Sequence, residues 1–272
     1  MLTNILITGV SGFIGSRIAL RVKENFSVIP VARKPDGQLD EDLKSNVLKL
    51  DLESTTVPVI SENVDTIIHV ATANDIISKD FKKGLDLSVM GTKKILDIAL
   101  ELGVKNLIFF STLQVYGTEL HGKIDEDNEV NCESPYSLNH FFGEELCKLY
   151  AKNYNLNISI IRPSNVYGLP DTDSFNRYSL VPLCFVKEVV DTGQLMIRSS
   201  GNQKRNFIST NEIADICINL LESFPEGVKY INAASDLTIT IKDVALLTAE
   251  VFKDIHGKDL KLSLIHISEP TR

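Results

Sequence analysis

Three glycines near the start of the chain have the spacing of a phosphate-binding loop. They are Gly9, Gly12 and Gly15 in the segment TGVSGFIG. The first glycine allows a tight turn, the second lets backbone N–H groups approach a pyrophosphate, and the third allows a helix to pack closely on a strand. A helix that begins here adds partial positive charge toward the phosphates. The pattern predicts a dinucleotide-binding loop made by Gly9, Ser11, Gly12, Phe13, Ile14 and Gly15.

The end of the second apolar run, residues 26–31, is where the adenosine ribose of such a cofactor is expected. An acidic residue there binds the 2′-hydroxyl of NAD, whereas a basic residue accommodates the 2′-phosphate of NADP. This chain has Arg33 and Lys34, and the first acid is Asp36. The pattern favours NADP over NAD, unless both basic residues are solvated loop charges. Asp51 follows the third apolar run and is placed either to contact the adenine amine or to begin a turn.

Short apolar runs alternate with helical patterns along the first part of the chain. A dinucleotide-binding loop requires this arrangement, because it connects a strand to a helix. The apolar runs predict buried parallel strands at 4–8, 26–31, 47–50, 65–70, 106–110 and 158–161. Helical periodicity predicts helices at 14–25, 85–102 and 135–154. Strands that alternate with helices give a parallel sheet with helices on both faces. We therefore expect an α/β fold with a Rossmann-type, doubly wound sheet over residues 1–163.

The alternation weakens after Pro163. Residues 164–205 predict loops and one helix near 180–190, and they are followed by a helix at 211–222, a short strand at 230–233 and a helix at 241–253. We expect residues 164–261 to form a small, interleaved and incomplete substrate-binding lobe. Residues 262–272 read LSLIHISEPTR, which is the translation of a sequencing adapter. We expect this tail to carry no fold information and the true C-terminus to be missing.

Composition excludes several classes of protein. The formal net charge is −8 and Lys and Arg form no basic run, which argues against a nucleic-acid partner. The apolar runs are shorter than the roughly 20 residues that cross a bilayer, which argues against a membrane partner. The cysteines show neither a C-x-x-C pair nor metal-ligand spacing, so we expect reduced thiols, no metal and a cytoplasmic location. They are Cys132, Cys147, Cys184 and Cys217.

Several short motifs, in order along the chain, resemble those of the extended short-chain dehydrogenase/reductase family, the NAD(P)-dependent sugar-nucleotide epimerases and dehydratases. They are TGVSGFIG at 8–15, DTIIHVA at 65–71, GT at 91–92, STLQVYG at 111–117, SPY at 134–136, RPSNVYG at 162–168 and QKRNFI at 203–208. Ser88 stands where the family has Asn. The resemblance implies a nucleotide-sugar substrate and a homodimer formed through helices 85–102 and 135–154. It also implies cofactor contacts from Leu52, Val70, Ala71, Thr72, Tyr136, His140 and Pro163.

The resemblance assigns the chemistry to Thr112 and Tyr136. Tyr136 would exchange a proton with a sugar hydroxyl held by Thr112, while hydride passes to or from the nicotinamide. Without the resemblance, Thr112 reads as a strand-end cap and Tyr136 as an ordinary aromatic at a helix start. The family has Lys four residues after the tyrosine, but this chain has His140, which that spacing places on the same helical face.

The exchange of lysine for His140 decides how the site is interpreted. A free tyrosine has a pKa of about 10 and a nearby cation lowers it, whereas a free imidazole, with a pKa of about 6.5, is mostly neutral at pH 7. His140 is therefore held charged or acts in a proton relay, or it only positions the ribose, or it marks a site that binds cofactor without turnover.

The resemblance also gives expectations for the substrate. Arg205 falls where a guanidinium makes bidentate contacts to the substrate diphosphate, and the alternative is a surface ion pair. Asn165 falls where an Asn contacts the substrate. Leu113 and Gln114 replace the Asp-Glu pair of the 4,6-dehydratases, so that reaction is disfavoured. A 4-epimerase or a keto-sugar reductase remains, with the epimerase slightly favoured. The alternative is a catalytically weak cofactor-binding or sensor protein on the same fold.

Overall fold

The computed structural model describes residues 3–34, 39–169, 171, 178 and 180–264. Its main feature is a seven-stranded sheet with the order β10-β6-β5-β4-β1-β2-β3, in which every pair is parallel. The strand order reverses between β1 and β4, and ligands of open α/β sheets bind at such a point. The predicted Rossmann-type sheet is confirmed. Its strands are β1 (Asn4–Thr8), β2 (Ser27–Ala32), β3 (Leu48–Lys49), β4 (Thr66–His69), β5 (Asn106–Phe110), β6 (Asn157–Pro163) and β10 (Val228–Ala233).

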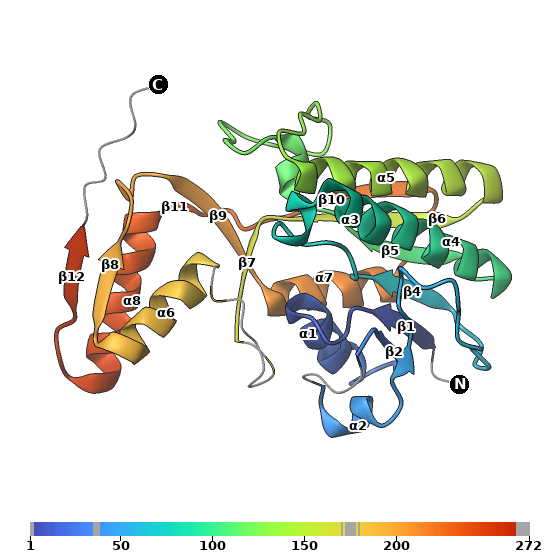
Figure 1. Ribbon diagram of the computed structural model, residues 1–272, viewed down its shortest axis with the longest axis horizontal. Helices are drawn as coiled ribbons and strands as arrows, with labels where there is room; N and C mark the ends of the chain where they lie inside the picture. Colours follow the sequence, from blue (N-terminus) through green and yellow to red (C-terminus); the bar gives the residue numbers. More distant parts are fainter. Residues whose placement is uncertain (1–2, 35–38, 170, 172–177, 179, 265–272) are drawn as a thin grey trace. The chain divides into compact units, whose positions relative to one another are not determined.

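Helices cover both faces of this sheet (Figure 1). On one face α1 (Phe13–Val22) packs against α7 (Thr210–Glu222), and the short α2 (Glu41–Lys44) follows β2. The helices of the other face are α3 (Phe81–Leu85), α4 (Gly91–Glu101) and α5 (Pro135–Tyr154). The helix predicted at 85–102 begins earlier and contains a π-helical turn, η2 (Asp86–Met90), before α4. Two 3₁₀ turns, η1 (Ile77–Lys79) and η3 (Leu113–Tyr116), complete this part of the chain.

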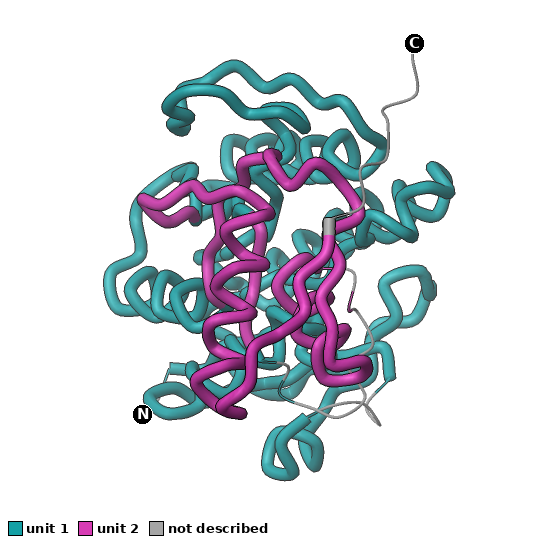
Figure 2. Tube along the Cα trace, turned by 90° about the vertical axis from the view of Figure 1, so that its left-hand side faces the viewer, with its two compact units in different colours: residues 1–164, 169–175, 210–233 teal, residues 165–168, 176–209, 234–272 magenta. Residues whose placement is uncertain are grey.

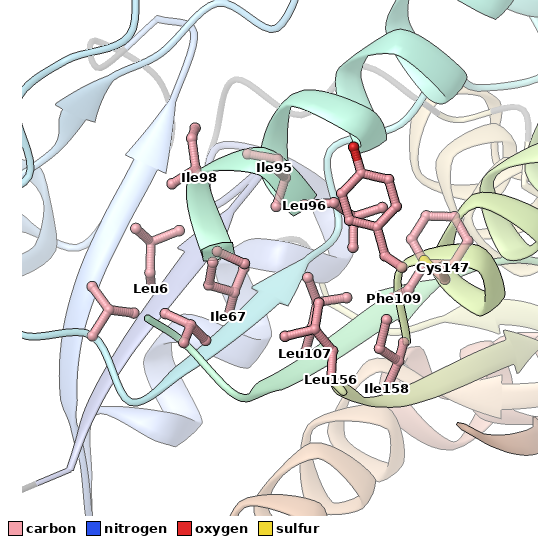
Figure 3. Close-up of a cluster of buried hydrophobic side chains, with 14 of the residues drawn as sticks. Leu6, Ile67, Ile95, Leu96, Ile98, Leu107, Phe109, Cys147, Leu156 and Ile158 are labelled. Carbon is pink, nitrogen blue, oxygen red and sulfur yellow. The ribbon is translucent and has the colours of Figure 1, made fainter. Parts of the chain in front are cut away.

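The sheet is held by a cluster of buried apolar side chains between it and α4 and α5 (Figure 3). Burial of each large aliphatic side chain contributes about 1.5–3 kcal/mol. Because neighbouring strands each bury side chains in this cluster, their registers are fixed, and so are the loops that leave their carboxyl ends. The cluster includes Leu6, Ile67, Ile95, Leu96, Ile98, Leu107, Phe109, Cys147, Leu156 and Ile158.

The chain divides into two compact units, which Figure 2 distinguishes by colour. The first unit comprises residues 1–164, 169–175 and 210–233, and the second comprises 165–168, 176–209 and 234–272. In the second unit, β11, β9 and β7 form a small sheet, and β8 pairs in parallel with β12. Its elements are β7 (Asn165–Tyr167), α6 (Val181–Thr192), β8 (Gln194–Ile197), β9 (Lys204–Ser209), β11 (Thr238–Thr240), α8 (Ile241–His256) and β12 (Lys261–Leu264).

The structure differs from the sequence-based expectation mainly after residue 163. The helix expected near 180–190 is present as α6, but β7, β8 and the first two residues of β9 lie in the segment that was expected to form loops. Residues 210–233 were expected in the second lobe, whereas α7 packs on α1 and β10 pairs with β6, so both belong to the first unit. β12 includes residues 262–264 of the predicted adapter tail, and the rest of that tail lies outside the described residues.

Candidate functional site

The loop between β1 and α1 is shaped by its glycines. Gly9 has a φ of 74°, a conformation that glycine adopts without strain, and its N–H donates to the carbonyl of Val31 at 3.0 Å. The N–H of Gly12 donates to the carbonyl of Gly9 at 2.8 Å. Gly12 is the N-cap of α1 and has no side chain that could cap the first turn. The N–H groups of that turn form the positive end of the helix dipole. The loop is therefore suited to an anionic ligand.

The third glycine brings α1 directly against the end of β1. A Cβ atom at Gly15 would overlap the carbonyl group of Gly9, and a Cβ atom at Gly9 would lie 3.0 Å from the backbone nitrogen of Ala71. Both overlaps involve backbone atoms, which cannot rotate away as a flexible side chain can. The close approach of helix, loop and strand therefore depends on the missing side chains.

We expect Gly15→Ala to weaken the binding of a nicotinamide dinucleotide about tenfold or more. The added methyl group must push α1 off the loop, and overpacking of this kind costs about 1–3 kcal/mol, where 1.4 kcal/mol corresponds to a tenfold change in affinity. Titration of cofactor fluorescence measures the change. Gly103→Ala is the control for general destabilisation, because its φ of 69° strains an alanine although a Cβ atom there meets nothing within 4 Å, and it should leave the affinity unchanged. Equal affinities of Gly15→Ala and the unchanged chain would contradict the prediction.

A buried hydrogen-bond chain ties the glycine loop to the end of β4. The Thr8 hydroxyl accepts the N–H groups of Val70 and Ala71 at 3.1 and 3.2 Å, so its proton is donated to His69 Nδ1, 2.8 Å away. His69 then carries its own proton on Nε2, which donates to Thr92 Oγ1 at 3.1 Å. Burial lowers the pKa of His69 to about 3, so the ring is neutral at pH 7. These hydrogen bonds fix the end of β1 and the end of β4, two segments that the sequence predicts to contact the cofactor.

The loop after β3 lies beside the end of β2. Arg33 follows β2, and its guanidinium forms an ion pair with Glu53 at 3.8 Å. Asp51 Oδ1 accepts the N–H of Glu53 at 3.1 Å, so the structure shows Asp51 at the start of a turn, which is one of its two interpretations from sequence. Leu52 is buried in this loop and Lys34 is exposed beside Arg33.

The residues predicted to bind a cofactor gather at the carboxyl edge of the first unit's sheet. Parallel strands end at the same edge, so the loops that leave them are neighbours. The structure therefore brings together positions that are far apart in the sequence. They are Gly9, Ser11, Gly12, Phe13, Ile14 and Gly15 after β1, Arg33 after β2, Asp51 and Leu52 after β3, Val70, Ala71 and Thr72 after β4, and Pro163 at the end of β6. The catalytic candidate Thr112 lies at the same edge, after β5.

Thr112 and Tyr136 are each fixed by the start of a helix. Thr112 is buried, and its Oγ1 accepts the N–H of Gln114 at 3.3 Å as the N-cap of η3. A hydroxyl that accepts one hydrogen bond can still donate its proton, so capping is compatible with a contact to substrate. Tyr136 is the second residue of α5 and is partly buried. The start of α5 is held by a capping box of Ser134 and Ser137.

His140 lies one turn after Tyr136, with the ring centroids 4.6 Å apart and an interplanar angle of 69°. The side chain is 2% exposed, and burial lowers its pKa to about 4, although the backbone of Phe110 and Ala73 acts in the opposite direction. Within the described part of the chain, neither ring nitrogen has a hydrogen-bond partner of good geometry. The imidazole is neutral at pH 7, so the structure disfavours a permanently charged His140. It leaves the relay, the ribose-positioning role and a site that binds cofactor without turnover.

Glu144 and Arg162 form a buried ion pair, and Glu144 lies in the same helix as Tyr136 and His140. Glu144, one turn after His140 in α5, is fully buried and accepts from Arg162 Nε and Nη2 at 2.9 and 2.6 Å. It also accepts the hydroxyl of Ser111 at 2.5 Å, and Arg162 Nη1 donates to the hydroxyl of Tyr116 at 2.5 Å. The pair therefore joins the ends of β5 and β6 to α5. Sequence reasoning gave Glu144 no role, although an acid on the same helical face as His140 was a usable signal.

The two residues predicted to bind substrate lie in the second unit. Asn165 in β7 donates from Nδ2 to the carbonyl of Asn206 at 2.8 Å. Arg205 in β9 is partly buried and donates from Nη1 to the carbonyl of Lys204 at 2.9 Å. The structure brings Asn165 and Arg205 together on two paired strands, β7 and β9. Their roles toward a substrate stay predictions.

The residues that the structure describes form no metal cluster, no membrane-spanning helix and no disulfide. No group of three or more His, Cys, Asp and Glu side chains in that part of the chain could hold a metal ion. None of the helices described there is both long enough and apolar enough to cross a membrane. The four cysteines form no disulfide, and burial raises the pKa of Cys147 and Cys217 well above the usual range, which keeps both as thiols.

Comparisons with known proteins agree on one family. The profile of the NAD dependent epimerase/dehydratase family matches residues 5–234. A putative UDP-glucose 4-epimerase of Methanocaldococcus jannaschii is 28% identical over 218 residues, which cover 77% of this chain and 70% of that protein. A dTDP-4-dehydro-6-deoxy-D-allose reductase of Streptomyces bikiniensis is 23% identical over 91% of this chain and 80% of its own length. A solved UDP-N-acetylglucosamine 4-epimerase of Methanobrevibacter ruminantium, in complex with UDP-N-acetylmuramic acid, is 25% identical with a TM-score of 0.84, covering 97% of this chain and 86% of that one.

Proposed function

Because this chain belongs to the NAD dependent epimerase/dehydratase family, we propose that it is a nicotinamide-dependent enzyme that acts on a nucleotide sugar, either as a 4-epimerase or as a keto-sugar reductase. The observation that carries the proposal is the carboxyl edge of the sheet, where the glycine loop lies in one unit with Thr112 and Tyr136. Both reactions move a hydride and a proton at one sugar carbon and its oxygen. The two hydroxyl groups suit the proton part of that chemistry.

The residues at this edge fit a dinucleotide. Side chains at Gly9 or Gly15 would collide with backbone atoms, and the N-terminus of α1 favours a pyrophosphate. The loop would hold the pyrophosphate, the ends of β2 and β3 would hold the adenosine, and His140 would meet the nicotinamide ribose. When bound, a nicotinamide cofactor supplies hydride transfer, which amino-acid side chains cannot supply.

Tyr136 is proposed as the acid and base, and Thr112 as the group that orients the substrate hydroxyl. A positioned acid or base of this kind contributes about 10²–10⁴-fold to a rate. His140 is neutral, so it can make one hydrogen bond to a ribose hydroxyl but supplies no positive charge to Tyr136. The imidazole also packs edge-on against the tyrosine ring, and this contact restricts rotation of that ring.

The choice of cofactor rests on the end of β2. Arg33 and Lys34 favour NADP, because their charges suit a 2′-phosphate. Arg33 is nevertheless paired with Glu53, so its charge is partly balanced. NADP and NAD therefore both belong to the proposal, with NADP the one that the basic residues favour.

The nucleotide sugar is proposed from the second unit and from the family. Arg205 would contact the diphosphate through its guanidinium, and Asn165, on the paired strand β7, would contact the same substrate. The two relatives are named as a UDP-sugar enzyme and a dTDP-sugar enzyme. The class of substrate is therefore a sugar carried on a pyrimidine nucleoside diphosphate.

A homodimer formed through α4 and α5 is also proposed, and a cytoplasmic location stays a prediction. Three large apolar side chains are exposed on α5, and Met90 is exposed at the turn that leads into α4. Exposed apolar side chains that gather on neighbouring helices indicate a contact surface. On α5 they are Phe142, Leu149 and Tyr154.

A second candidate function is a cofactor-binding protein with little turnover. The observation in its favour is the neutral, buried His140, which supplies no positive charge to promote the ionisation of Tyr136. The cofactor loop does not depend on that residue. Binding would then be retained while the chemical step is slow.

The test combines binding with product analysis. The chain is titrated with NADH and NADPH, and UDP- and dTDP-sugars are then incubated at pH 7 and at pH 9. Reduction is followed by nicotinamide absorbance, and epimerisation by chromatography, because it causes no net redox change. Binding with turnover of any of these sugars supports the enzyme. Binding without turnover favours the second candidate, and the absence of binding to either cofactor overturns both.

A further inference from the structure

We propose that Glu53 sets the balance between NAD and NADP by presenting a carboxylate to the end of β2 from the loop after β3. The inference rests on the proposed function, because it concerns the adenosine ribose of a nicotinamide dinucleotide. The end of β2 itself carries Arg33 and Lys34 and no acid. Glu53 lies 3.8 Å from the Arg33 guanidinium, so an acid is present there although it comes from another strand's loop.

The backbone places the two residues side by side. β2 and β3 pair in parallel, with Val31 opposite Leu48 and Ala32 opposite Lys49. The pairing continues one residue further, because the N–H of Leu50 donates to the carbonyl of Ala32 at 3.1 Å. The chain then turns, and Glu53 reaches the residue that directly follows β2. The ribose of a dinucleotide is expected at this edge of the sheet.

The loop that carries Glu53 is anchored from α4. The ammonium group of Lys94 donates to the carbonyls of Asp51 and Leu52 at 3.3 and 2.6 Å, and to that of Ser54. An ammonium has three donors, so these three carbonyls use all of them. Leu52 also lies against Gly91, where a Cβ atom would be 3.1 Å from the leucine side chain. Glu53 is therefore presented by a held turn.

The charges of Glu53 and Arg33 act differently on the 2′-substituents of NAD and NADP. The neutral 2′-hydroxyl of NAD can donate to the Glu53 carboxylate. The 2′-phosphate of NADP is drawn to Arg33 but repelled by Glu53, and Glu53 also neutralises part of the charge on Arg33. Both side chains are about half exposed, so the effect is moderate and weakens with salt.

The first experiment replaces Glu53 by Gln, which keeps the shape and removes the charge. Dissociation constants are measured for NADH and NADPH, and for 5′-ADP and 2′,5′-ADP, which report the ribose end alone. We expect Glu53→Gln to shift the ratio of the two constants about tenfold toward the 2′-phosphorylated ligand of each pair, and less at high salt. Glu101→Gln, which removes an exposed charge at the other end of α4, should leave the ratio unchanged.

The second experiment tests the anchor. Lys94→Met should weaken NADH more than NADPH, because the turn that presents Glu53 to the 2′-hydroxyl loses its position. Lys93→Met is the matched control, since Lys93 is the exposed neighbour that pairs with Asp97 at 2.8 Å, and it should change neither affinity. A Glu53→Gln variant that binds both cofactors as before, or that changes both equally, overturns the inference and leaves the proposed function standing. Failure of the unchanged chain to bind either cofactor overturns both.

Discussion

Replacing His140 by lysine is expected to raise turnover at pH 7 by about a hundredfold. A free tyrosine has a pKa of about 10, and a cation within about 4–6 Å favours its ionised form. His140 cannot supply that charge, because burial lowers its pKa to about 4. Each unit by which a lysine lowers the pKa of the tyrosine multiplies the ionised fraction at pH 7 about tenfold. A shift of about two units therefore gives the expected gain.

The buried position can accept an ammonium group. Burial, the largest influence on the pKa of residue 140, would lower the pKa of a lysine too, but a free lysine starts at about 10.4 and a free histidine at about 6.5, so a lysine stays charged at pH 7. The backbone of Phe110 and Ala73, which favours the charged form of residue 140, acts in the same direction. The measurement is the pH dependence of kcat/KM. Because the reacting form of Tyr136 as a base is the deprotonated one, a lower pKa moves the rising limb of the profile to lower pH. The limb of His140→Lys should lie about two units below that of the unchanged chain.

Two controls separate charge from shape. His140→Gln keeps a neutral polar side chain and should keep the original profile to within a few fold. The double variant Tyr136→Phe/His140→Lys should lose the gain, because the group that the lysine acts on is gone. A His140→Lys variant that folds normally but turns over more slowly would contradict the prediction and would show that the imidazole itself takes part, as a proton relay.

The first unit was predictable because its strands are buried on both faces. The runs 5–7 and 107–110 are apolar throughout, and short runs of that kind indicate strands that are covered on both faces. The strands β8 and β9 carry no such signal. Each has polar and apolar residues mixed over four to six positions, and each becomes a strand only by pairing with residues distant in the sequence, such as β12 for β8.

The candidate site also contains residues whose roles could be predicted from the sequence and residues whose roles could not. The glycine loop follows from local backbone requirements, so its residues could be read from the sequence. The charge state of His140 could not, because it is set by burial rather than by the residue type. Lys94 is indistinguishable from Lys93 in the sequence, yet only Lys94 meets the three carbonyls of the loop after β3. Contacts of this kind depend on how elements pack, and a single sequence does not record that.

Breaking the ion pair between Glu144 and Arg162 is expected to reduce the free energy of unfolding by about 3–5 kcal/mol. Arg162→Met would leave Glu144 fully buried with the hydroxyl of Ser111 as a remaining donor. Denaturant unfolding measures the loss. Glu145→Gln is the matched control, because Glu145 is the exposed neighbour that pairs with Lys148, and surface pairs contribute about 0–1 kcal/mol. An Arg162→Met variant as stable as that control would contradict the prediction.

The double variant Glu144→Leu/Arg162→Met shows what the pair is for. Removing both charges leaves no unpaired buried ion, so most of the lost stability should return. Turnover should not return with it. Glu144 holds the hydroxyl of Ser111, the residue before Thr112, and it lies on the same helix as Tyr136, so the pair fixes the two hydroxyl groups relative to each other. A displacement of about 1 Å between reacting groups can cost about a hundredfold in rate. Recovery of stability without kcat would assign the pair to positioning, whereas recovery of both would assign it to folding alone.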